Sequence, residues 1–296
     1  MEENQLSASG GKSLFKISLV HLALILLSSF LASIFSSLLL FSYIVSDSKY
    51  IPSASHLETL PPKEKAAILK QNQENIKQLG VDFQKEPQKY IEKYYDGIVK
   101  HANWLLFGQS FIWAVCFLLP AYYLLKRKMQ INIESFSESM QWQNVYLGIL
   151  YGLAIFFASY MFLSFAKSID VPTQANNFQK ILFDGLKGNA SLLLWGIYAV
   201  GLFTGIVEEL FFRGYLLRHF WEEGWEKEGL LLTSLLFGMV HFAGEASFLV
   251  PTLMVAIGYT LGYLYLKYRT IWIPIVAHSI YNSSGLLFAY FKGSEF

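Results

Sequence analysis

The sequence predicts an all-α membrane protein that crosses the bilayer several times. Two observations predict this class. Of the 296 residues, 54% are hydrophobic and only 15% are charged, whereas an average soluble domain has about 25% charged residues. The apolar residues also gather in windows of roughly 20 residues with few charges, long enough to cross a hydrocarbon core of ~30 Å.

Composition also excludes several kinds of partner and site. The formal net charge is only +1, and without a dense basic face we expect no nucleic-acid partner. Cys116 is the only cysteine and lies within an apolar run, which excludes a disulfide framework and a zinc site built from cysteines. We expect Cys116 to be a small apolar core residue.

Seven windows are candidate transmembrane helices. They cover residues 16–45, 104–125, 145–166, 191–212, 229–243, 248–266 and 271–291. The first window resembles a signal peptide, but its apolar run is much longer than such a peptide needs and no small-residue cleavage site follows it. We therefore expect a helix that the protein retains.

Short basic clusters predict the orientation of these helices. The clusters are Lys12 with Lys16, residues 126–128, Arg213 with Arg218, and Lys267 with Arg269. All four lie on one side of the membrane if the N-terminus is cytoplasmic, and cytoplasmic loops carry the excess of Lys and Arg. Residues 46–103 then lie outside the cytoplasm.

This external insertion is rich in Lys and Glu in near balance. Its stretch PPKEKAAILKQNQENIKQLG begins with prolines and ends at Gly80, which are start and stop signals of a helix. We expect a second helix from Pro87 toward the membrane and interpret the insertion as a solvated helical hairpin. The alternative, a cap that recruits substrate, has no support in the sequence.

A small set of strongly polar side chains interrupts the last four windows. These residues are Glu208, Glu209, Arg213, His241, His278 and Asn282. Ionisable side chains inside a membrane are costly and usually face a bundle interior or a water-filled cavity, where they are functional. Either histidine alone is more often a satisfied core residue than a ligand, but the combination in consecutive helices is hard to explain by chance.

Glu208 and Glu209 are expected to have different roles. Glu209 and Arg213 are four residues apart, so they share a helix face and can form an ion pair. Glu208 points about 100° away around the helix, so one arginine cannot pair with both carboxylates from the same face. We therefore expect Glu209 and Arg213 to support the fold and Glu208 to be free for chemistry.

The polar residues can converge if the helix that begins at residue 191 continues past Arg213 toward Phe220. No Pro or Asn-Gly signal interrupts it. His278 and Asn282 are four residues apart and share a face. The site would then lie in the inner half of the membrane, beside a water-accessible wall with Thr204, Ser279 and Ser283.

At these positions the sequence resembles the CPBP intramembrane proteases, which include the CAAX prenyl proteases and the bacteriocin-processing Abi proteins. The resemblance rests on three motifs in order, namely E-E-x-x-x-R from Glu208, F-x-x-x-H from Phe237 to His241, and H-x-x-x-N from His278 to Asn282. It covers roughly residues 190–290. Because this family has eight core helices, the resemblance implies a bundle of seven or eight transmembrane helices.

The chain then divides into four parts. These are an N-terminal tail with the first transmembrane helix (1–45), the extracytoplasmic insertion (46–103), the second and third transmembrane helices with their loops (104–189), and a CPBP-like catalytic core (190–291). We expect an integral protein of a bacterial cytoplasmic membrane, in contact with membrane lipid.

The resemblance implies proteolysis within the membrane, with Glu208 as the base. The residue types suit this chemistry, because amide hydrolysis needs an activated water and stabilisation of the oxyanion. His241, His278 and Asn282 could donate hydrogen bonds to the oxyanion, while Glu209, Arg213 and Phe237 support the site. We expect this glutamate-and-water chemistry, and no cofactor is required for it.

A zinc ion is the alternative that the residues leave open. His241 and His278 could bind it together with a carboxylate, leaving a position for water. If Glu208 were a ligand, Glu209 or Glu245 would have to act as the base.

Two other functions compete with an endopeptidase that cleaves a membrane-anchored protein or peptide. A transporter or channel also buries ionisable groups, but it usually shows inverted repeats and broken helices, which the sequence lacks. A catalytically inactive membrane scaffold that binds a partner would be expected to have lost a motif residue, and none is lost. The sequence does not indicate whether a substrate is prenylated.

Overall fold

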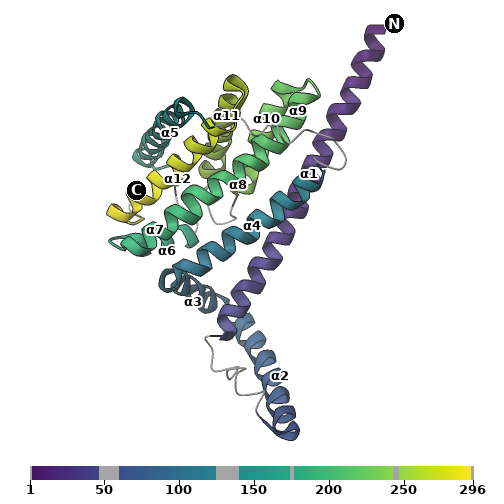
Figure 1. Ribbon diagram of the computed structural model, residues 1–296. Coiled ribbons are helices and arrows are strands. Elements are labelled where there is room, and N and C mark those ends of the chain that lie inside the picture. The colour runs from purple at the N-terminus through teal and green to yellow at the C-terminus, as the bar shows by residue number, and fades with distance from the viewer. Residues whose placement is uncertain (1, 47–59, 125–139, 174–176, 243–246, 295–296) are drawn as a thin grey trace.

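The structure is a computed structural model that describes residues 2–46, 60–124, 140–173, 177–242 and 247–294, and all regular elements in these ranges are helices (Figure 1). The predicted all-α class is therefore confirmed. The basic cluster at 126–128 and the alternative base Glu245 lie outside the described residues.

The described residues fold into a series of α-helices. They are α1 (Glu2–Ser46), α2 (Pro62–Lys85), α3 (Pro87–Lys100), α4 (Ala102–Leu124), α5 (Trp142–Ser168), α6 (Asn177–Leu186), α7 (Ala190–Gly196), α8 (Gly205–Glu209), α9 (Arg218–Glu222), α10 (Glu226–Val240), α11 (Leu249–Tyr268) and α12 (Trp272–Lys292). Two π-helical segments, η4 (Ile197–Thr204) and η5 (Leu210–Leu217), join α7, α8 and α9. Residues 190–222 are thus one continuous long helix, as predicted.

Five helices among the described residues are long and apolar enough to cross a membrane. They cover Lys16–Val45, Leu105–Tyr123, Trp142–Ser168, Ala190–Glu222 and Leu249–Tyr268. The other two predicted spans are helical but do not meet both criteria. Helix α10 has 15 residues, about 22 Å at the rise of an α-helix, and α12 is long enough but carries His278 and Asn282. Length and apolarity support five of the seven predicted spans.

The insertion contains the two predicted helices, but the stop signal at Gly80 was wrong. Helix α2 passes through Gly80 and ends at Lys85, just before Pro87 begins α3. A glycine inside a helix costs only ~1 kcal/mol, whereas proline cannot continue the hydrogen-bond ladder. The stronger of the two signals therefore sets the boundary.

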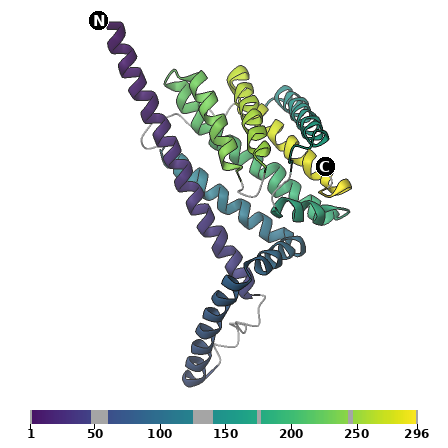
Figure 2. The same cartoon turned by 180° about the vertical axis from the view of Figure 1, so that it is seen from behind.

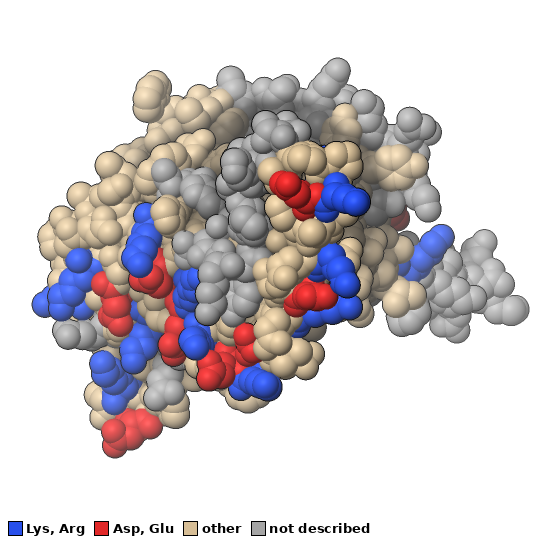
Figure 3. Space-filling view, turned by 90° about the horizontal axis from the view of Figure 1, so that it is seen from below, with Lys and Arg blue, Asp and Glu red and all other residues tan. Residues whose placement is uncertain are grey.

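The two insertion helices pack on the bundle to different extents, and α2 does so through Leu79, which is buried in a cluster with Tyr43 and Ile44 of α1. Most of α2 projects away from the bundle in both ribbon views, and α3 lies against α1, α4 and α6 (Figures 1 and 2). Figure 3 looks onto this end of the molecule and shows acidic and basic side chains interspersed. Lys89 pairs with Glu86 and Lys100 with Asp96 on the exposed surface. This mixture of charges agrees with the solvated character predicted for the insertion.

Small residues bring the C-terminal helix close to its neighbours. Helix α12 lies between α5 and the long helix 190–222 (Figure 1). A Cβ on Gly205 would lie only 2.8 Å from Ser279 Oγ, and a Cβ on Gly201 would overlap the Ser283 hydroxyl. Membrane helices commonly approach through small residues spaced four apart. The close approach places the α12 residues His278 and Asn282 directly beside the long helix.

Helices α1 and α4 run side by side along another flank of the bundle (Figures 1 and 2). Leu24 and Ile25 of α1 and Phe117 of α4 share a buried cluster with Phe211 and Phe212 of the long helix. Cys116 is buried in the same cluster with a free thiol, as expected of an apolar core residue. This contact makes α4 a wall of the region that contains Glu208.

Candidate active site

Glu209 and Arg213 form the predicted ion pair at the centre of the bundle. Arg213 Nη1 donates to Glu209 Oε1 at 2.8 Å, and the two side chains are 2% and 0% exposed. Arg213 Nη2 donates to the Gly258 carbonyl of α11 at 2.7 Å, and the guanidinium carbon lies 4.9 Å from the centre of the Phe237 ring. The pair therefore connects the long helix to α10 and α11.

Glu209 also holds His278. The His278 Nδ1 lies 2.7 Å from the Glu209 Oε1 that binds Arg213. Because a carboxylate paired with arginine is ionised and only accepts hydrogen bonds, Nδ1 must be the donor. The ring is 4% exposed, and this bond fixes its orientation with Nε2 turned away from Glu209.

Glu208 points from the long helix in a different direction, about 100° around it from Glu209, and faces both histidines. Its Oε2 lies 3.8 Å from His278 Nε2 and 3.9 Å from His241 Nε2, and its side chain is 24% exposed. Among the described residues, no group forms a hydrogen bond with this buried oxygen. The offset between the two glutamates thus separates a fully buried carboxylate in an ion pair, Glu209, from a partly exposed one without such a partner, Glu208.

His241 lies directly after the last residue of α10, where helix carbonyls lack intrahelical partners. Its Nδ1 is 2.7 Å from the Phe237 carbonyl oxygen. A carbonyl only accepts hydrogen bonds, so Nδ1 carries a proton and Nε2 is the ring nitrogen that faces Glu208. The Phe237 ring lies 4.6 Å from the His241 ring and 5.8 Å from the His278 ring, centre to centre. Phe237 therefore packs beneath both histidines.

Asn282 lies one turn beyond His278 and packs against η4. Its Nδ2 donates to the Val200 carbonyl at 3.1 Å, which uses one of the two N–H groups of the amide. Asn282 thus helps to hold α12 against the long helix and keeps one donor.

Both π-helical segments flank Glu208 and Glu209. The Thr204 hydroxyl donates to the Ala199 carbonyl, five residues earlier, at 2.9 Å. The π-helical turns themselves, in η4 and η5, are rare in proteins and occur often at functional sites. The long helix is therefore continuous as predicted, but it is not uniformly α-helical, and only the short α8 keeps α-helical phase around the two glutamates.

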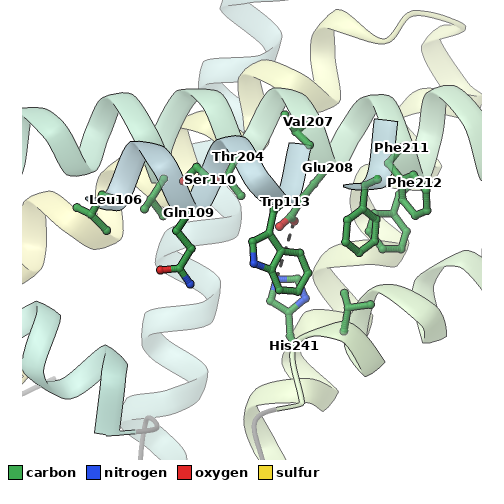
Figure 4. A pocket seen from close by; sticks show the side chains of 13 residues that line it. Leu106, Gln109, Ser110, Trp113, Thr204, Val207, Glu208, Phe211, Phe212 and His241 are labelled. Carbon is green, nitrogen blue, oxygen red and sulfur yellow. Dashed lines mark ion pairs between the residues drawn. The ribbon is translucent and has the colours of Figure 1, made fainter. Parts of the chain in front are cut away.

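Glu208 and His241 line a cavity of about 260 Å³. The other lining residues are Leu106, Gln109, Ser110, Trp113, Phe117, Val200, Thr204, Val207, Phe211, Phe212 and Val240. Figure 4 shows the facing Glu208 and His241 side chains, with the Trp113 ring of α4 overlapping them in this view and Gln109 further along α4. Thr204 lines the cavity as predicted. Ser279 and Ser283 do not, because they pack against Gly205 and Gly201.

The α4 wall was not predicted from the sequence. Gln109, Ser110 and Trp113 line the cavity but lie outside the segment that carries the three motifs. The available signal was the pair Gln109–Ser110, which interrupts an otherwise apolar window. The cavity also extends along α4 toward the end that follows the insertion.

In the part of the chain that the structure describes, no group of three or more His, Cys, Asp or Glu side chains is arranged to hold a metal ion. Tetrahedral zinc ligands at 2.0–2.1 Å lie about 3.3 Å from one another. The Glu208 oxygen is 3.8–3.9 Å from the two Nε2 atoms, so these groups would have to close by roughly half an ångström. The donor types fit zinc, because both Nε2 atoms are free and both Nδ1 atoms have hydrogen-bond partners.

Comparisons with known proteins agree with the motifs. Residues 190–284 match the family model of the type II CAAX prenyl endopeptidase Rce1-like proteins. A Bacillus subtilis (strain 168) protein named "Putative membrane peptidase YdiL" is 29% identical over 149 residues, which is 48% of this chain and 57% of that protein. The chain thus spans a little more than half the length of this relative. No solved structure matches the chain. Residues 190–284, which carry Glu208, His241 and His278, are therefore similar to the Rce1-like family.

Proposed function

We propose that this protein is an intramembrane endopeptidase that hydrolyses a peptide bond of a membrane-associated protein or peptide. The observation that carries the proposal is the Glu208 carboxylate, which lines the cavity together with His241 and whose Oε2 lies within 4 Å of the Nε2 atoms of both His241 and His278. Intramembrane carboxylates and histidines in such a cavity are functional by default. The family match of residues 190–284 supports the same reaction class.

When His241 is neutral, its Nε2 and the Oε2 of Glu208 are both hydrogen-bond acceptors, and they face each other. Their separation of 3.9 Å exceeds a direct hydrogen bond but suits a water that donates to both, because each such bond is ~2.8 Å long. In the proposed reaction, this water gives a proton to Glu208 Oε2 while its oxygen bonds to the scissile carbonyl carbon. The carbonyl π electrons move to oxygen and form the oxyanion.

His278 and Asn282 supply the donors for that oxyanion. In the imidazolium form, His278 donates from Nδ1 to Glu209 and from Nε2 into the site, and Asn282 retains one N–H. Donors that are fixed before the reaction stabilise developing charge without reorganisation. Glu208 then passes its proton to the amide nitrogen as the C–N bond breaks, which leaves a carboxylic acid and an amine.

A bound zinc ion would be held by His241, His278 and Glu208 and would supply a polarised water. The reaction would then need another base. Glu209 is fully buried and bonded to both Arg213 and His278, so it is not free for that role. The other alternative base, Glu245, lies outside the described residues, and the glutamate-and-water chemistry needs neither of them.

We further propose that the protein lies in a bacterial cytoplasmic membrane with its N-terminus in the cytoplasm. The five apolar helices support a membrane location. The basic residues beside the predicted spans support the orientation. Its partners would then be membrane lipid and a membrane-anchored protein or peptide.

The test compares membranes from cells that express the native chain, Glu208→Gln, or the exposed control Glu223→Gln. Peptides with new termini should appear with the native chain and the control and be absent with Glu208→Gln. These termini would also identify the substrate. Identical peptide sets from the native and Glu208→Gln membranes would refute the proposal.

A further inference from the structure

We propose that the Gln109 side chain binds the backbone of the substrate, and that Tyr94 of the insertion sets the orientation of the Gln109 amide. This inference rests on the proposed function. Gln109 lies on α4 and lines the same cavity as Glu208 and His241. Figure 4 shows its side chain extending on the same side of α4 as the Trp113 ring. Neither Gln109 nor Tyr94 belongs to residues 190–284, which match the family model.

The Tyr94 hydroxyl fixes the Gln109 amide. It donates to Gln109 Oε1 at 3.1 Å. The Tyr94 ring is 8% exposed and packs in a buried cluster with Tyr43, Leu105 and Leu182, so its position is determined by the fold. Burial raises the pKa of Tyr94 to about 12, so the hydroxyl keeps its proton and remains a donor across the physiological pH range.

This bond assigns separate tasks to the two ends of the Gln109 amide. Because Oε1 accepts from Tyr94, the nitrogen with its two N–H groups is the end that remains for a ligand. The surrounding wall is largely apolar, with Leu106, Trp113 and Phe117. When a peptide lies against such a wall, its backbone carbonyls have no water to donate hydrogen bonds to them. A carbonyl without a hydrogen-bond donor is costly in an apolar medium. Gln109 offers the matching donor.

The same contact gives the insertion a role in the site. Helix α3 packs against α4, and Tyr94 is the α3 residue that hydrogen-bonds to a cavity-lining side chain within the described residues. Its effect on the substrate passes through Gln109, so Tyr94 is a positioning residue. Helix α2 contributes Leu79 to the buried cluster that holds the Tyr94 ring, while most of its length projects away from the bundle (Figure 2).

Binding measured in the Glu208→Gln background tests the inference without requiring turnover. The probe is a fluorescent peptide with a prenylated cysteine three residues from its C-terminus, and the readout is its dissociation constant in detergent micelles. Gln109→Met, similar in size but without an amide, should weaken binding roughly three- to tenfold, the range of one neutral hydrogen bond. Tyr94→Phe should also weaken binding, but less than Gln109→Met does.

A matched control and a double variant separate this role from general packing. Tyr90→Phe makes the same chemical change on α3, where Tyr90 packs at the edge of the cluster, and should leave the dissociation constant unchanged. Tyr94→Phe combined with Gln109→Met should bind no more weakly than Gln109→Met alone. Unchanged binding by Gln109→Met, or additive effects in the double variant, would overturn the inference. Cleavage by the native chain against Glu208→Gln tests the proposed function separately.

Discussion

Replacing Arg213 with methionine should strongly destabilise the protein, because it leaves Glu209 charged and fully buried. The substitution removes the 2.8 Å ion pair, the 2.7 Å bond to the Gly258 carbonyl and the contact with the Phe237 ring. Breaking a buried ion pair by removing one partner costs about 3–5 kcal/mol. This is a large share of the 5–15 kcal/mol that stabilises a typical protein. The measurement is the free energy of unfolding in mixed micelles, titrated with a denaturing detergent.

Two further variants make this prediction sharp. Arg218→Met removes an arginine from the same long helix that also pairs with a glutamate four residues on, but this pair is 18% and 36% exposed. It should cost clearly less than Arg213→Met, because a solvent-accessible pair contributes no more than ~1 kcal/mol and Glu222 is not left buried without its partner. Glu209→Gln combined with Arg213→Met should be more stable than Arg213→Met alone, because no unpaired charge is then buried. Equal losses for Arg213→Met and Arg218→Met would refute the reasoning.

Three other perturbations test the packing, the metal and the orientation. Gly205→Ala should destabilise the protein by about 1–3 kcal/mol because its Cβ would crowd Ser279, whereas Gly285→Ala, where a Cβ meets nothing within 4 Å, should have little effect on unfolding. The glutamate-and-water chemistry predicts that chelation leaves cleavage unchanged and that elemental analysis finds no stoichiometric zinc; activity that chelation removes and zinc restores would contradict it. In a Cys116→Ala background, Lys70→Cys on α2 should react with a membrane-impermeant thiol reagent from outside, and labelling only from the cytoplasmic side would reverse the orientation.

Local spacing was sufficient to predict part of the site. The Glu209–Arg213 pair and the separate direction of Glu208 depend on residues within one helical turn. The structure has both features. The bond between His278 and Glu209 joins residues 69 positions apart, and no pattern in the sequence specifies that distance. The motifs indicated which residues belong together but not which of them touch.

Long-range packing also explains what the sequence analysis missed. The α4 wall is present because α4 lies against α1 and the long helix, and a single apolar window does not indicate its neighbours. Ser279 and Ser283 were expected to face water because they are polar, but Gly205 and Gly201 accommodate them at a helix contact. Small polar side chains serve both purposes in membranes. Whether such a serine faces water or lies at a helix contact depends on the position of the neighbouring helix.

The role of Glu208 is tested most directly by the cleavage rate of the purified protein. The substrate is a peptide that spans a cleavage site found in the membrane comparison. Glu208→Gln should lower kcat/KM by on the order of 10²- to 10⁴-fold, the contribution of a positioned general base. Its unfolding should stay close to that of the native chain, because the Glu208 side chain is partly exposed and its Oε2 has no hydrogen bond within the described residues. Retention of full kcat/KM by Glu208→Gln would contradict the assignment of Glu208 as the base.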